Sequence, residues 1–157
     1  LDQAELKPEQ DTEDSGNDWH ANLIWIDRRK TILFCSDATL FCCVAADVRK
    51  SDIRSMESLF ITSLTDTMRF EGYSPGIIAK YVMELRPVEI RRSSNRSVLG
   101  SMNDYVFHLK YLVEDAGGLA HSDMGAVAHN LNIIPQVKRS FFIAIEAFDQ
   151  SIKERFA

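Results

Sequence analysis

The sequence predicts an α+β fold, in which a small antiparallel β-meander of three to four strands packs against about four to five helices on one face of the sheet. Short runs rich in β-branched and aromatic residues cluster in the first third of the chain. Segments with apolar residues at helical spacing follow from about residue 51 onward. Strands that precede helices in this way are typical of the α+β class. The 157 residues, 45% of them hydrophobic, suffice for one domain with a buried core.

An acidic segment, residues 1–18, precedes the predicted domain. It holds seven of the 23 acids and one of the 18 bases, so residues 19–157 carry 16 acids and 17 bases. A segment with this charge density and few apolar residues cannot bury enough surface to fold alone. We therefore expect a flexible acidic lead at 1–18 and a single globular domain at 19–157. The lead is either a solubilising tail or an arm that binds a partner or mimics nucleic acid.

Three short runs predict the strands of the meander. The apolar runs 21–26 and 31–35 flank a polar turn at 27–30, which is the pattern of a β-hairpin. Turn-forming residues follow, and the run 39–45 predicts a third strand. Residues 88–91 alternate between apolar and polar, which predicts a short fourth strand.

Two helices are predicted between the third and fourth strands. The first begins at the Ser51-Asp52 cap and ends at Gly72. The second begins at Ser74-Pro75, because serine caps a helix and proline suits its first position. Pro87 ends it.

A long helix is predicted next, capped by Ser97 and ended by Gly117-Gly118. Gly100 lies inside it, which indicates that another group packs close to that position. A short helix begins at Ser122-Asp123, and a last helix begins at Ser140. The buried side of the last helix consists of apolar residues: Phe141, Phe142, Ile145, Phe148 and Ile152.

The most informative polar segment is 91–97, where Arg91, Arg92 and Arg96 and four small polar residues lead into the long helix. A helix N-terminus favours anions, and arginine binds phosphate or carboxylate through two parallel hydrogen bonds. This predicts an anion site that includes Arg96 and Ser97 and has a phosphate-containing ligand or nucleic acid as its partner. Alternatively, Arg91 and Arg92 are solvent-facing and Ser97 only caps the helix.

A second basic cluster, Arg28-Arg29-Lys30, lies at the predicted hairpin tip, where it can contact a phosphate backbone. Such clusters are also common in soluble turns. If both clusters share a face, they favour nucleic acid, because affinity grows with the number of phosphates neutralised. The acidic pI of about 5.3 argues against a dedicated nucleic-acid-binding protein.

Catalytic and metal chemistry have weaker signals. His20 can form an acid–base couple with Asn103 or Asp104, although His20 can equally be a solvated residue. Cys35, Cys42 and Cys43 lack the spacing of a zinc site, and adjacent strand residues point to opposite faces, so we expect core cysteines and no metal. No phosphate-binding loop or dinucleotide fingerprint is present, so no cofactor is predicted.

Composition also suggests a cellular setting. Three cysteines cannot all pair, which favours a reducing, cytoplasmic compartment. No apolar run approaches the roughly 20 residues of a membrane span, so we expect no membrane association.

Two runs resemble a bacterial family that is known only as a domain of unknown function: residues 18–23 (Asp-Trp-His-Ala-Asn-Leu) and residues 96–104 (Arg-Ser-Val-Leu-Gly-Ser-Met-Asn-Asp). The residues Arg28-Arg29-Lys30 and Leu33-Phe34 also fit, and the resemblance covers about residues 19–135. It implies no activity. The family has a threonine- and lysine-containing turn where this chain has residues 91–94, so Arg96 and Asn103 match better than Arg91 and Arg92.

These observations leave three functional hypotheses. The first is a binding protein with an anion site at residues 91–104, extended by Arg28, Arg29 and Lys30. The second is an enzyme that acts on a phosphate-containing substrate through His20, Arg96, Asn103 and Asp104. The third is an interaction protein whose last helix forms a homodimer through its phenylalanines. A purely structural role of the 96–104 run, with Arg96 held by its neighbours, is also open.

Overall fold

The computed structural model describes residues 18–88, 96–137 and 139–156. Its centre is a three-stranded antiparallel sheet in the order β1 (Trp19–Ile26), β2 (Arg29–Ser36) and β3 (Cys42–Ala45). The α+β class and the antiparallel meander are therefore confirmed. Most of the predicted fourth strand, together with Arg91, Arg92 and residues 1–17, lies outside the described residues.

The predicted hairpin joins β1 to β2 through a two-residue turn. Asp27 and Arg28 have φ angles of 50° and 61°, the left-handed conformation that matches the twist of the two strands. The register pairs Ile26 with Arg29 next to the turn. Arg28 therefore lies at the very tip of the hairpin.

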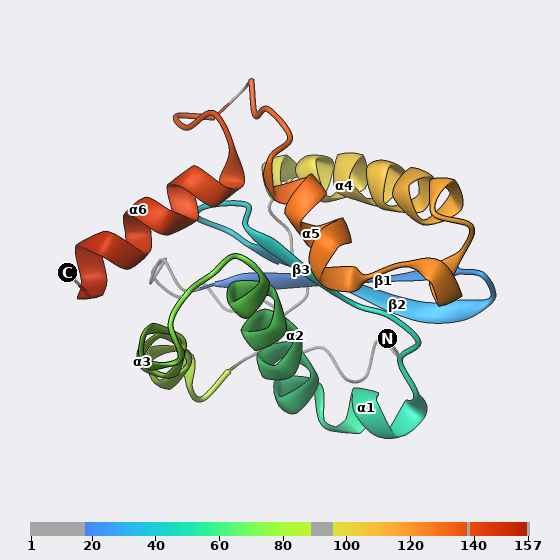
Figure 1. The fold of residues 1–157 in the computed structure, drawn as a ribbon, viewed down its shortest axis with the longest axis horizontal. Coiled ribbons are helices and arrows are strands. Elements are labelled where there is room, and N and C mark those ends of the chain that lie inside the picture. Colours follow the sequence, from blue (N-terminus) through green and yellow to red (C-terminus); the bar gives the residue numbers. More distant parts are fainter. Residues whose placement is uncertain (1–17, 89–95, 138, 157) are drawn as a thin grey trace.

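Helices cover both faces of the sheet, so the prediction of a single covered face is wrong (Figure 1). The helices α2 (Met56–Phe70) and α3 (Pro75–Leu85) lie on one side, and α4 (Arg96–Asp115) and α5 (Met124–Asn132) lie on the other. Six consecutive residues of β2, 31–36, are buried. A strand that is covered on both faces requires such a run without polar alternation.

Two apolar cores result, one on each face of the sheet. The first joins Phe34 of β2 to Phe60 of α2, and Phe34 and Phe60 have ring centroids 5.1 Å apart. The second joins Leu33 of β2 to residues of α4 and α5. Cys42 and Cys43 belong to different cores, which confirms that adjacent cysteines of this strand point to opposite faces.

The helix predicted at 51–72 is divided into α1 (Lys50–Arg54) and α2. The Asp52 carboxylate accepts a hydrogen bond from the Arg49 backbone N–H at 2.8 Å, so α1 begins before the predicted cap. Ser55, with φ −113° and ψ 51°, leaves the helical conformation and separates the two helices.

Most local signals at helix ends are confirmed. Ser74 and Asp123 cap α3 and α5 by accepting backbone hydrogen bonds. Gly72, Gly117 and Gly118 have positive φ angles where their helices end. The prediction for Ser97 is wrong, because α4 begins at Arg96 and Ser97 lies within its first turn.

The last helix, α6 (Ala144–Phe156), begins later than the predicted Ser140. The Gln136 backbone N–H donates to the Phe142 carbonyl at 2.6 Å, and residues 139–143 are not helical. Phe142 is consequently 65% exposed and not part of the core, contrary to expectation. Phe148 and Ile152 are buried as predicted.

Candidate functional site

The first turns of α4 and residues 135–137 and 139, in the connection between α5 and α6, line a cavity of about 620 Å³. The α4 side contributes two serine hydroxyls, a guanidinium and a carboxylate, and the connection contributes a second guanidinium. The lining residues are Arg96, Ser97, Gly100, Ser101, Asp104, Pro135, Gln136, Val137 and Arg139.

Hydrogen bonds to the core hold the 135–139 connection in place. Gln136 Nε2 donates to Tyr105 Oη at 3.2 Å, and Tyr105 Oη donates to the Leu40 carbonyl at 3.0 Å. Tyr105 is buried, and burial raises the pKa of its hydroxyl far above the usual value, so the hydroxyl remains a proton donor. The connection is therefore anchored on α4 and on the loop between β2 and β3.

This anchor positions Arg139. Its backbone N–H donates to the Gln136 carbonyl at 3.2 Å. Its Nη2 atom is buried and has no hydrogen-bond partner within the described part of the chain. Three neutral side-chain atoms of the described residues, Trp19 Nε1, Thr31 Oγ1 and Ser63 Oγ, share this property, and Arg139 Nη2 is the one that belongs to a charged group. An unpaired buried donor costs free energy, and more so on a charged group.

The α4 wall brings together part of the predicted site. Arg96, Ser97 and Asp104 all line the cavity. Ser101 Oγ donates to the Ser97 carbonyl at 3.2 Å. Asn103 is exposed on α4 and is not among the lining residues.

His20 does not join this group. Its Nε2 atom lies 2.9 Å from Asp37 Oδ1, and both side chains are largely buried. Among the described residues, no hydrogen bond links His20 to Asn103 or Asp104. Sequence analysis missed Asp37, which lies in the turn after β2, because only the strand register brings it next to His20.

Arg139 and Gln136 were also missed. Their only sequence signal is the basic pair at residues 138–139 shortly after Pro135. Such a pair is common on protein surfaces. Only the fold places Arg139 opposite Arg96.

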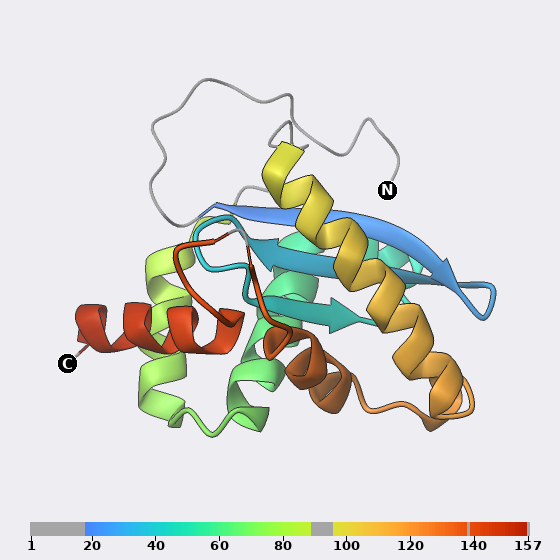
Figure 2. The same ribbon diagram turned by 90° about the horizontal axis from the view of Figure 1, so that it is seen from above.

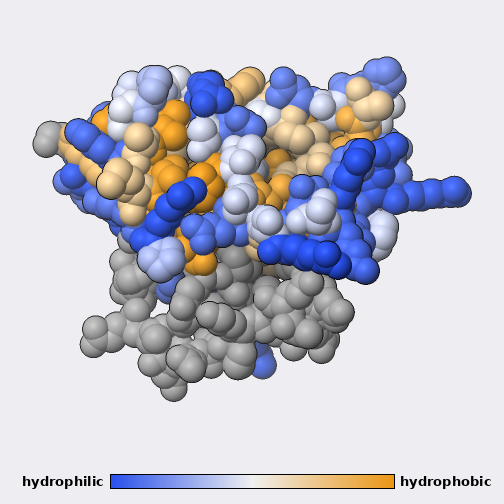
Figure 3. Space-filling view, turned by 90° about the horizontal axis from the view of Figure 1, so that it is seen from below, coloured by the Kyte–Doolittle hydropathy of each residue, from blue (hydrophilic) through white to orange (hydrophobic). Residues whose placement is uncertain are grey.

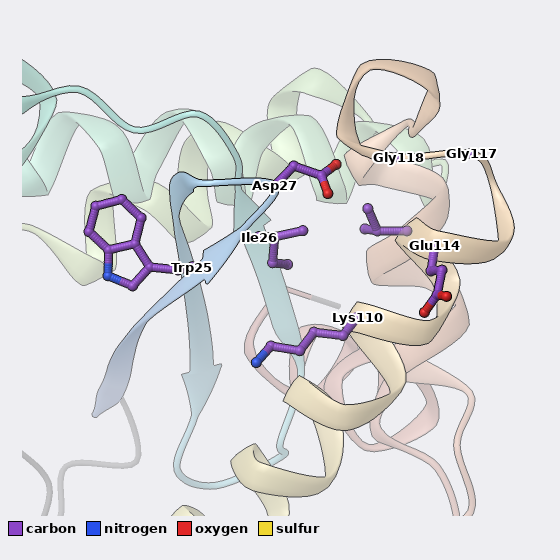
Figure 4. A pocket seen from close by; sticks show the side chains of 8 residues that line it. Trp25, Ile26, Asp27, Lys110, Glu114, Gly117 and Gly118 are labelled. Carbon is purple, nitrogen blue, oxygen red and sulfur yellow. The ribbon is translucent and has the colours of Figure 1, made fainter.

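The hairpin tip lies at the other end of α4, where Asp27 Oδ2 accepts a hydrogen bond from the Leu119 backbone N–H at 2.8 Å. Figure 4 shows a second cavity there, of about 640 Å³, between the end of β1 and the last turns of α4. A helix of 20 residues is about 30 Å long. The Arg28-Arg29-Lys30 cluster and Arg96 are thus separated by roughly the length of α4 and do not form one patch (Figure 2).

The charges of the tip cluster are partly compensated. Arg29 forms an ion pair with Asp47 at 2.8 Å, and Lys30 Nζ lies 5.7 Å from the centroid of the Trp25 ring. Arg28 is exposed at the turn.

The three cysteines are fully buried free thiols, which confirms the expectation of core residues. Burial raises the pKa of Cys43 to about 12 and raises the pKa of Cys35 and Cys42 well above the usual range. Thiolate chemistry is therefore disfavoured at all three. Among the described residues, no group of three His, Cys, Asp or Glu side chains is arranged to hold a metal ion. No helix in this part of the chain is long and apolar enough to cross a membrane.

A family model, described as a domain of unknown function, DUF6933, matches residues 1–147. The chain belongs to this family. The match agrees with the resemblance to an uncharacterised family that the sequence suggests. In this DUF6933 protein the cavity residues, 96–139, all lie within the matched range, so the cavity is part of the family domain. No curated protein matches the chain. The family description names no activity.

Proposed function

We propose that this DUF6933 protein binds a small anionic ligand, one that carries a phosphate or carboxylate group, in the cavity between α4 and residues 135–139. The observation that supports this most directly is the buried, unpaired Nη2 atom of Arg139. A buried donor on a cation is unfavourable without an acceptor. An anion in the cavity supplies that acceptor.

The opposite wall offers further donors. Arg96 carries a second guanidinium, and Ser97 and Ser101 carry hydroxyl groups. The first turn of α4 adds the positive end of the helix dipole. The Asp104 carboxylate lines the same cavity, so the preferred ligand also carries a hydroxyl or amino donor. The 96–104 run that resembles the bacterial family forms this wall.

The size of the cavity favours a small ligand over a nucleic-acid backbone. About 620 Å³ lies within the range of small-molecule sites. A nucleic-acid backbone gains affinity from many phosphate contacts, whereas the second basic cluster lies about 30 Å away. Three buried thiols suit the reducing, cytoplasmic setting that the composition suggests.

Titration calorimetry with inorganic phosphate, phenyl phosphate and benzoate tests this proposal. We expect Arg139→Gln to weaken binding by about 10-fold or more, because a hydrogen bond to a charged group contributes about 1.5–3 kcal/mol. Arg96→Gln should also weaken binding of these anions. Arg69→Gln is the matched control, because this arginine is exposed on α2 and does not line the cavity.

The melting temperature of the free variant separates binding from structure. Arg139 is half-buried, and its Nη2 atom is buried without a partner. Removing this unpaired donor should leave the ligand-free Arg139→Gln protein at least as stable as the parent. Binding that persists in Arg139→Gln, or no binding of any of the three anions, contradicts the proposal. An Arg139→Gln protein that melts at a lower temperature would indicate a structural role for this arginine.

The alternative of an enzyme that acts on a phosphate-containing substrate has less support. Asp104 lines the cavity and can serve as an acid or base there. His20, the other predicted participant, is held by Asp37 and is not among the lining residues. The geometry therefore favours binding over a His20–Asp104 mechanism.

A homodimer through the last helix is the remaining alternative, and it stays a prediction. Phe148 of α6 is buried, and Phe141 and Phe156 are packed partly against the two cores. Phe142 is exposed, but it precedes α6. Most of the apolar surface that such a dimer would use is thus already covered within one chain.

A further inference from the structure

The hairpin tip and α1 form a basic surface around an exposed tryptophan. We call it the Trp25 surface. Six basic side chains belong to it, and five of them are exposed. Asp27, Asp47 and Asp52 are the acids nearest to them in the chain, and Glu114 and Lys110 of α4 line the same cavity as Trp25. The surface consists of Trp25, Arg28, Arg29, Lys30, Arg49, Lys50 and Arg54.

A backbone contact brings these residues together from two parts of the chain. The Val48 N–H donates to the Lys30 carbonyl at 2.8 Å, so the segment that leads into α1 runs beside the end of β2. The ion pair between Arg29 and Asp47 joins the same two segments. Figure 3 shows hydrophilic side chains gathered at the right-hand end of the molecule, whereas apolar residues gather towards the left.

The three acids leave the surface positive. Asp27 accepts a hydrogen bond from the Leu119 N–H, and Asp52 accepts one from the Arg49 N–H. Asp47 pairs with Arg29. Six bases against three acids contrast with 11 bases and 13 acids among the rest of residues 19–157. An extended polyanion is therefore attracted to this end of the molecule.

Trp25 is the unusual member of the surface. It is 59% exposed, although tryptophan is usually largely buried. Figure 4 shows its indole on the opposite side of β1 from Ile26, which faces the α4 side. The ring has Lys30 Nζ 5.7 Å from its centroid. An exposed indole among cations is the arrangement that binds single-stranded nucleic acid, in which bases stack on the ring and cations hold the backbone.

We propose that the Trp25 surface binds single-stranded nucleic acid. A base stacks on the Trp25 indole, while Arg28, Lys30 and Arg49 contact flanking phosphates. A duplex keeps its bases stacked inside and offers none to the indole, so single strands are preferred. This surface lies near the end of α4, whereas the Arg139 cavity lies along its first half, so the surface does not depend on a ligand in that cavity.

Intrinsic fluorescence tests the contact directly. The chain has two tryptophans, and Trp19 is 5% exposed and shielded from a ligand. An oligothymidylate of about 12 nucleotides, within the usual site size, should quench the emission of Trp25. Trp25→Phe should bind while losing the fluorescence change. Trp25→Leu should weaken binding by about 5- to 160-fold, which is the contribution of stacking one base.

The salt dependence of binding tests the contacts between the basic side chains and the phosphates. Arg28→Gln should reduce the slope of log affinity against log salt by about 0.7, as expected for one phosphate contact on a single strand. Phe107→Leu and Arg69→Gln are the matched controls, because both side chains are exposed outside the Trp25 surface, and both variants should bind like the parent.

Four outcomes overturn the proposal. They are no salt-dependent binding of the oligonucleotide, unchanged affinity in Trp25→Leu, equal affinity for a duplex of the same length, and Trp25-dependent binding of phosphatidylserine vesicles without binding of the oligonucleotide. None of them bears on the anion cavity, whose probes and variants are different.

Discussion

Among single residues, Asn132 has the most decisive structural role. It lies at the end of α5 with no exposed surface. Its Oδ1 accepts from the Cys42 backbone N–H at 2.8 Å, and its Nδ2 donates to the Cys42 carbonyl at 3.0 Å. The side-chain amide thus replaces a neighbouring strand at the outer edge of β3. This explains how a short edge strand can be buried.

We expect Asn132→Ala to lower the free energy of unfolding by about 2–4 kcal/mol, because it leaves a buried N–H and a buried carbonyl unpaired and opens a small cavity. Asn130→Ala is the control, since Asn130 lies on the same helix but is exposed. The free energy of unfolding of Asn130→Ala should differ from that of the parent by no more than about 0.5 kcal/mol. Urea denaturation measures the free energy of unfolding of both variants. Equal losses in the two variants would refute this role of Asn132.

At the scale of elements, Gly100 within α4 and Gly118 in the turn after it have different surroundings for an added Cβ atom. Gly118 has a φ angle of 113°, and an added Cβ would lie 3.2 Å from Asp27 Oδ2. Gly100 lies inside the helix, and a Cβ there meets nothing within 4 Å. The expectation that another group packs close to Gly100 is therefore wrong, because this position faces the open cavity.

The two positions predict opposite effects of the same substitution. Gly118→Ala should destabilise the protein by about 1–3 kcal/mol, because alanine is strained at this φ and displaces the hairpin tip. Gly100→Ala should stabilise it by about 0.5–1 kcal/mol, because alanine is the better helix former. Thermal or chemical unfolding of the two variants measures both changes in stability. A stabilising Gly118→Ala would mean that the tip does not dock on the turn as described.

Elements that depend on local chemistry could be predicted from the sequence. Ser74 and Asp123 cap their helices, and the glycines end theirs, because these signals act within a few residues. The two covered faces could have been predicted as well, from the unbroken apolar run at 31–35. The division at Ser55 and the late start of α6 could not, since the first has no turn-forming glycine or proline and the second depends on a contact of Gln136.

The candidate site was predictable only in part. Arg96, Ser97 and Asp104 belong to one helix, so their spacing already places them near each other. Arg139 comes from a segment some 40 residues later and reaches the cavity through the Gln136–Tyr105–Leu40 hydrogen bonds. Nothing in a single sequence encodes that chain of contacts. For the same reason the pairing of His20 with Asp37 was not foreseen.

For the molecule as a whole, α4 separates two cationic regions of different shape. At its start, two guanidiniums line a cavity suited to one small anion. At its far end, the Trp25 surface is open and suited to an extended strand. Asp104, the cavity residue nearest to the end of α4, lies 11 residues or about 17 Å before Asp115, which is about two Debye lengths at physiological ionic strength. One chain can therefore hold both ligands without competition.

This separation predicts independent binding. Arg139→Gln should weaken phenyl phosphate binding and leave oligothymidylate binding unchanged, and Trp25→Leu should do the reverse. In the double variant each ligand should lose the same binding free energy as in its own single variant, within about 0.5 kcal/mol, because distant sites without shared partners do not couple. Titrations of each ligand in the presence of saturating amounts of the other complete the test. Mutual exclusion of the two ligands, or a loss of both affinities in one single variant, would show that they share one site at one end of α4.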